Sequence, residues 1–98
     1  MDQKLKYTIM LFYSNINQVS LKTRIMINNF IDTHHYPIKI TIHEVDYDQD
    51  KNLTQQYGIM GTPAIIFMEN GNLVRRLFGE VTSDEFRNVI EGIYNLRK

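Results

Sequence analysis

Hydrophobic residues change their spacing along this chain, and each spacing predicts a different element. Residues 6–14, KYTIMLFYS, form a nearly continuous run of β-branched and aromatic side chains, which is typical of a strand buried on both faces. Residues 38–45, IKITIHEV, alternate isoleucine with polar side chains, which predicts a strand with one drier face. TPAIIFM and NLVRRLF flank Asn70-Gly71, the strongest hairpin signal in the chain. We therefore expect two separate strands followed by a hairpin.

The polar segments between these strands carry helix signals. Asn17 is a candidate N-cap of a helix that ends near the His34-His35 pair. The apolar face of this helix is predicted from approximate helical spacing and comprises Val19, Ile25, Met26, Asn29 and Phe30. Asp48 or Asp50 is a candidate N-cap of a short helix over KNLTQQYG.

The end of the chain predicts a third, amphipathic helix. Thr82 and Glu85 have the spacing of a capping box. Apolar side chains then recur at intervals of three and four residues, at Phe86, Val89, Ile90, Ile93 and Tyr94. The predicted order is β-α-β-α-β-β-α within one domain, residues 1–98. The first crossover should place its two strands parallel, and the hairpin should add two antiparallel strands.

Composition narrows the functional classes. The chain has 98 residues and is 43% hydrophobic, which is ordinary for one globular domain. Eleven Lys and Arg balance eleven Asp and Glu, so no net charge favours nucleic acid or an anionic membrane. No segment has the length of apolar sequence that a membrane span needs, and we expect a cytoplasmic protein. Cysteine is absent, which excludes disulfides and thiolate chemistry within this sequence.

Residues 46–86 carry a resemblance to a known family. A helix ending in Tyr57-Gly58-Ile59 leads to Gly61-Thr62-Pro63 at the start of a strand, then to the Asn70-Gly71 hairpin and to Gly79. This arrangement, and the element order from Tyr7 onward, resembles the thioredoxin-like family. The resemblance implies a minimal thioredoxin-like α/β fold, with a four-stranded mixed sheet and helices on both faces. It also implies a cis peptide bond between Thr62 and Pro63.

The chain departs from the family at the residues that carry its chemistry. Asn17 and Ser20 match the two positions of the Cys-x-x-Cys motif, and Leu11 matches the buried acid that manages protons for the thiol. Thiol–disulfide exchange requires a thiolate that attacks sulfur. We therefore expect a redox-inactive protein without thiol–disulfide oxidoreductase activity.

A second departure lies at the N-terminus, where only a short segment precedes the first predicted strand. The segment Ile38–Val45 should then be an exposed edge strand, whose unpaired N–H and C=O groups can pair with another chain. Homodimerisation through this edge, or through a thinly covered sheet face, is a hypothesis. Lys39 opposes it because a charged residue guards the edge.

The family binds an extended segment across the loop before its proline, a form of strand addition. Carried over by position, the candidate binding surface comprises Ile16, Gln18, Val19, Tyr47, Gly61, Thr62, Pro63, Phe78 and Gly79. The leading hypothesis is non-covalent binding of a protein or extended peptide segment at this surface. The alternative that these residues are kept only for folding stays open.

Two further functions are alternatives. An enzyme or binder of thiol or glutathione-type ligands would use Asn17, Gln18 and Ser20 at a helix N-terminus, and a structural homodimer subunit would use the edge strand. Ser20 has no readable His-acid partner, so a catalytic nucleophile is not predicted. No cofactor and no metal are predicted, since the calcium-like spacing of Asp46, Asp48 and Asp50 is followed by Lys51 where glycine is needed. The remaining methionines after the first are predicted to fill the core: Met10, Met26, Met60 and Met68.

Overall fold

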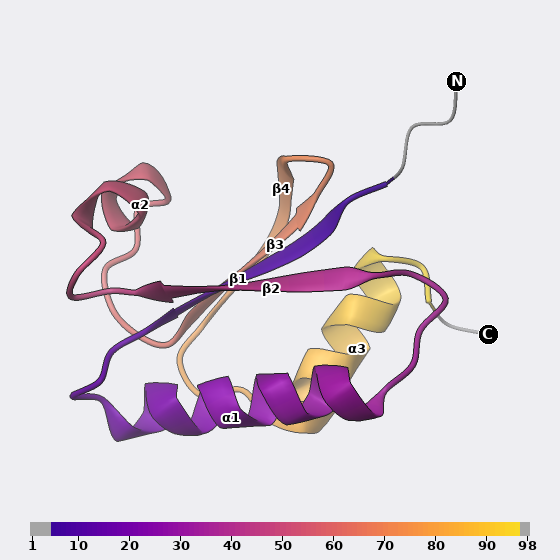
Figure 1. The fold of residues 1–98 in the computed structure, drawn as a ribbon, viewed down its shortest axis with the longest axis horizontal. Helices are drawn as coiled ribbons and strands as arrows, with labels where there is room; N and C mark the ends of the chain where they lie inside the picture. The colour runs from indigo at the N-terminus through magenta and orange to yellow at the C-terminus, as the bar shows by residue number, and fades with distance from the viewer. Residues whose placement is uncertain (1–4, 97–98) are drawn as a thin grey trace.

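The computed structural model describes residues 5–96 and folds them as a sheet with helices on both faces (Figure 1). The elements follow in the order β1 (Tyr7–Tyr13), α1 (Gln18–Thr33), β2 (Ile40–Asp46), α2 (Lys51–Gln56), β3 (Ala64–Glu69), β4 (Asn72–Phe78) and α3 (Ser83–Ile93). This β-α-β-α-β-β-α order confirms the fold class predicted from the sequence.

The sheet is mixed, as the connections require. Its four strands lie in the order β2-β1-β3-β4. β1 is parallel to β2 because a helix crosses between them, and it is antiparallel to β3. The β3–β4 hairpin turns at Asn70 and Gly71, which both have positive φ, 54° and 82°. Asn70 also joins the hairpin to the start of β1, because its side-chain oxygen accepts from Lys6 N at 2.8 Å.

α1 and α3 cover one face of the sheet, and they lie together on the same side of the strands in Figure 1. Their buried side chains join those of β1 and β3 in the larger core cluster, which includes Leu11, Ile27, Phe30, Phe67, Phe86 and Ile90. α2 covers one end of the opposite face (Figure 1), where Leu53 and Tyr57 pack on Met10, Phe12 and Ile66. Burial on both faces accounts for the continuous apolar character of β1 and β3.

The buried face of α1 differs from the predicted one. Ile25 is 61% exposed, and the buried residues of the helix are Ser20, Thr23, Ile27 and Phe30. The two hydroxyl residues enter the core because helix carbonyls satisfy them: Thr23 Oγ1 donates to Val19 O at 2.9 Å. The predicted face was right for Phe30, which is buried, and for Met26, which packs against the core. It was wrong for Ile25 and missed Ser20 and Thr23.

The predicted helix starts are confirmed. Asn17 caps α1 by accepting from Ser20 N at 2.8 Å, and Asp50 caps α2 by accepting from Leu53 N at 3.0 Å. Thr82 and Glu85 form both hydrogen bonds of a capping box, each 3.1 Å long. Each cap satisfies N–H groups that have no partner inside the helix.

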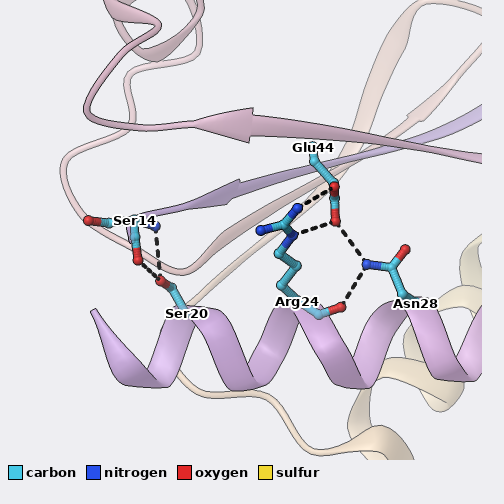
Figure 2. Close-up of polar contacts among 5 residues, drawn as sticks. All are labelled: Ser14, Ser20, Arg24, Asn28 and Glu44. Carbon is cyan, nitrogen blue, oxygen red and sulfur yellow. Dashed lines mark hydrogen bonds and ion pairs between the residues drawn. The ribbon is translucent and has the colours of Figure 1, made fainter. Parts of the chain in front are cut away.

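A polar cluster fixes α1 against β2 (Figure 2). Arg24 forms a two-point ion pair with Glu44, with Nε–Oε2 at 2.8 Å and a terminal nitrogen to Oε1 at 3.1 Å. Asn28 Nδ2 also donates to Glu44 Oε2 at 2.8 Å. The hydrogen bonds from Arg24 hold the pKa of Glu44 below its usual value and outweigh the opposing effect of partial burial, with a smaller contribution from Asn28.

Candidate functional site

A groove opens where the loop before β3 meets the end of β4. It encloses about 430 Å³ and is lined by residues of two segments, Gly58, Met60, Gly61, Thr62, Pro63, Phe78 and Gly79; we call it the Pro63 groove. The Thr62–Pro63 peptide bond is cis. Gly79 N donates to Pro63 O at 2.9 Å and so ties the two segments together. Gly79 has φ of 82°, a conformation that glycine adopts without strain.

Exposed apolar side chains border this groove. Met60 is 92% exposed and Phe78 is 58% exposed, and both line the groove wall. Ile16, 89% exposed, lies at the nearby N-terminus of α1. The prediction that Met60 fills the core was wrong, because this residue lies in the loop between the buried Ile59 and Pro63 and is not covered by another element.

Asn17 joins the N-terminus of α1 to the groove. Its side-chain oxygen caps the helix, and its Nδ2 donates to Thr62 O at 3.3 Å. Asn17 therefore contacts the backbone of the loop before Pro63. This bond occupies the carbonyl of Thr62, whereas the N–H of Thr62 donates to no atom within residues 5–96. Thr62 also lines the groove, so its unpaired N–H is a candidate donor to a bound molecule.

Ser20, in the first turn of α1, is fully buried with 0% exposure. Its hydroxyl accepts from Ser14 N at 2.9 Å and lies 3.0 Å from Ser14 O (Figure 2). It also lies 2.9 Å from Asn17 O, and either carbonyl can accept its proton. A side chain so enclosed reaches neither a substrate nor a ligand. The structure therefore removes Ser20 from the alternative in which the helix N-terminus binds thiol or glutathione-type ligands.

The structure brings together only part of the predicted binding surface. Five predicted residues line the groove: Gly61, Thr62, Pro63, Phe78 and Gly79. Three others, Ile16, Gln18 and Val19, are exposed beside Asn17 and flank the groove without lining it. Tyr47 does not line the groove and instead packs, partly buried, against the smaller core cluster that includes Met10 and Phe12. Two groove residues, Gly58 and Met60, were not predicted from the sequence. Met60 could have been predicted, because it directly precedes Gly61 of the loop motif.

The three aspartates after β2 act within the turn and the next helix. Asp46 Oδ1 accepts from Asp48 N at 3.0 Å, and Asp48 Oδ2 accepts from Ser14 Oγ at 2.6 Å. Asp50 caps α2. Within residues 5–96, no group of three or more His, Cys, Asp or Glu side chains gathers as metal ligands would. These contacts support a structural role for the three aspartates.

Comparison with known proteins identifies the family. A model of the thioredoxin-like domain matches residues 2–93, so this chain belongs to the thioredoxin-like family. It is a member without cysteine, and no residue of this sequence can form the thiolate that disulfide exchange requires.

Individual relatives agree with this assignment. The chain is 29% identical over 66 residues to NADPH-dependent thioredoxin reductase 3 of Arabidopsis thaliana, a match that covers 67% of this chain and only 12% of that protein. Its fold is similar to thioredoxin-2 of a malaria parasite, described as a component of protein secretion machinery, with a TM-score of 0.81, 19% identity, and coverage of 93% of this chain and 86% of that one. A mutant thioredoxin from Halobacterium salinarum gives a TM-score of 0.79 at 17% identity, covering 89% of this chain and 74% of that one.

Among the helices of residues 5–96, none has both the length and the apolar character needed to cross a membrane.

Proposed function

We propose that this domain binds an extended protein or peptide segment in the Pro63 groove, non-covalently and without redox chemistry. The observation that carries the proposal is the groove itself, about 430 Å³ in volume and walled by exposed Met60 and Phe78. Large apolar side chains gathered on one surface are typical of interaction sites, whereas single exposed ones need no explanation.

The groove offers two kinds of contact to such a segment. Met60, Pro63 and Phe78 provide an apolar wall for one bulky side chain of the partner. The N–H of Thr62 provides a backbone donor, as in binding by strand addition. Because Asn17 Nδ2 already bonds the carbonyl of Thr62, the partner is expected to contribute a carbonyl acceptor at this point.

The absence of cysteine makes this recognition reversible by dissociation alone. A thiolate at the N-terminus of α1 would form a mixed disulfide with a bound partner. Asn17 retains the capping oxygen and forms no covalent bond, so complex lifetime depends on the groove contacts.

A pair of substitutions on β4 tests the apolar wall. Phe78 lines the groove, whereas Leu73 is also exposed but lies at the other end of the strand. We expect Phe78→Ser to weaken partner binding by at least about tenfold, which is about 1.4 kcal/mol and within the range for burial of one large apolar side chain. Leu73→Ser, the matched control, should bind as the native domain does.

The measurement is affinity capture from native cell extract, followed by calorimetric titration of the captured partner. A third variant, Thr62→Pro, removes the proposed backbone donor and should lose the same partner once circular dichroism shows that it is folded. Equal binding by the native domain and by folded Phe78→Ser would refute the proposal.

A further inference from the structure

Methionine is the only sulfur-containing residue type in this chain, which has five methionines and no cysteine. The methionines differ sharply in accessibility. Met10 is 4% exposed, and Met26 and Met68 are partly buried against the two core clusters. Met60 is 92% exposed, and Met1 lies outside the described residues. Among the four described methionines, an oxidant in solution therefore has open access to Met60 alone.

The exposed methionine is also part of the functional surface. Met60 lines the Pro63 groove together with Thr62, Pro63 and Phe78. Its thioether is flexible and apolar, which suits a wall that adapts to a partner side chain. A sulfoxide at the same position is polar, and an apolar group that binds over it displaces its water while the Pro63 and Phe78 side chains supply no hydrogen bond in exchange.

We propose that Met60 is a site of oxidation by hydroperoxides, and that its sulfoxide converts the groove wall from apolar to polar. The sulfur lone pair attacks one oxygen of the hydroperoxide, an S–O bond forms and the O–O bond breaks. The departing oxygen takes up the proton and leaves as water or as an alcohol. The sulfur is oxidised by two electrons and the hydroperoxide is reduced by two, and the product is reducible by methionine sulfoxide reductases.

The consequence for partner binding rests on the proposed function, whereas the site of oxidation and the change in the groove do not. Oxidation removes apolar surface from the wall without breaking any of the hydrogen bonds that hold Pro63 and Gly79 in place. The groove is therefore expected to lose affinity for apolar groups while the fold persists.

The site is tested by treating the native domain with limiting hydrogen peroxide and mapping oxygen addition by peptide mass spectrometry over time. We expect Met60 to oxidise at least about ten times faster than Met10, because susceptibility follows exposure. Met26 and Met68 should react more slowly than Met60 as well. Equal rates at Met10 and Met60, or an unmodified Met60, would overturn the assignment.

The change in the groove is tested with the fluorophore anilinonaphthalene sulfonate, whose aromatic rings bind apolar surface and which requires no knowledge of the partner. Amide shifts of Gly61 and Gly79 in NMR spectra identify the fraction of probe bound at the groove. Oxidation should weaken binding there at least about threefold in the native domain, and Met60→Gln should reproduce the loss without peroxide. Met60→Leu should bind the probe and resist peroxide.

These measurements distinguish the proposed oxidation of Met60 from the proposed partner binding. Unchanged probe binding after complete oxidation of Met60 would refute the proposed change of the groove wall. An equal peroxide-induced loss of probe binding in Met60→Leu would refute it as well. If the domain captures no partner while Met60 oxidises selectively and probe binding falls, the proposed function fails and the oxidation site stands.

Discussion

Asn17 and Ser20, the two residues that the family resemblance matches to the cysteine positions, make different structural contacts. Asn17 uses its oxygen to cap α1 and its nitrogen to contact Thr62 O. Ser20 is buried under the start of the helix and connects it to Ser14 at the end of β1. The pair therefore fastens α1 to β1 and to the groove loop by hydrogen bonds alone.

This arrangement predicts a measurable cost for losing one hydroxyl. Ser20→Ala leaves the buried N–H of Ser14 without the acceptor that it has at 2.9 Å, which should lower the free energy of unfolding by about 1–3 kcal/mol. Thr33→Ala, which removes an exposed hydroxyl near the end of the same helix, should cost less than about 0.5 kcal/mol. Urea denaturation followed by circular dichroism measures both, and equal stabilities would contradict the role given to Ser20.

At the scale of elements, α1 is held to β2 by charge as well as by packing. Glu44 accepts hydrogen bonds from Arg24 and Asn28 across the space between helix and strand (Figure 2). The Arg24 guanidinium also lies over the Tyr13 ring, 4.4 Å from its centroid, a favourable cation–π geometry. The cluster is partly exposed, so its contribution is moderated by solvent.

The cluster predicts a pH dependence of stability. Arg24 lowers the pKa of Glu44 in the folded state, so this contribution is fully present above the pKa of the unfolded chain and is lost as the pH falls through the lower folded value. Glu44→Gln should therefore destabilise the domain most at neutral pH, and the difference from native should shrink toward about pH 3. Urea denaturation across this range measures the difference; a gap that widens as the solution is acidified would contradict the assignment.

At the scale of the whole molecule, the sheet has two edges within residues 5–96. β2 forms one of them, with Thr41 and His43 exposed along it, and β4 forms the other. An unpaired edge can accept a strand from a second copy of the chain. Homodimerisation through β2 therefore remains a hypothesis that the edge position supports.

The edge hypothesis makes a prediction about size in solution. If β2 pairs between copies, the apparent mass measured by light scattering should rise toward that of a dimer with increasing concentration. Thr41→Lys places a charge on the edge and should return the domain to a monomer, while Thr33→Lys, on the exposed end of α1, should leave the dimer intact. A native domain that stays monomeric at high concentration would rule the pairing out.

Much of the fold was predictable because its signals are local. The Asn70-Gly71 turn and the caps at Asn17 and Thr82 depend on residues at most three apart along the chain. The wrong face assigned to α1 had a local cause as well. Apolar spacing was counted without allowing for Ser20 and Thr23, whose hydroxyls are satisfied by carbonyls of the chain and can be buried.

The groove could be predicted only in part. Gly61, Thr62 and Pro63 belong to a continuous motif that marks the loop, and Phe78 and Gly79 followed from the family resemblance. Tyr47 does not line the groove, because its side chain packs against the smaller core cluster, a contact that the local sequence does not encode. Met60 was missed because an isolated methionine is as typical of a core as of a surface.

The sequence by itself determined the order of the elements, their caps and turns, and the absence of thiol chemistry. These properties follow from residue identity and from interactions between near neighbours along the chain. The tertiary structure decided that Met60 is exposed in a groove, that Ser20 is buried and that Asn17 contacts Thr62. Solvent exposure and hydrogen bonds across 45 residues of sequence depend on how the helices and loops pack against the sheet, so only the folded chain defines this surface.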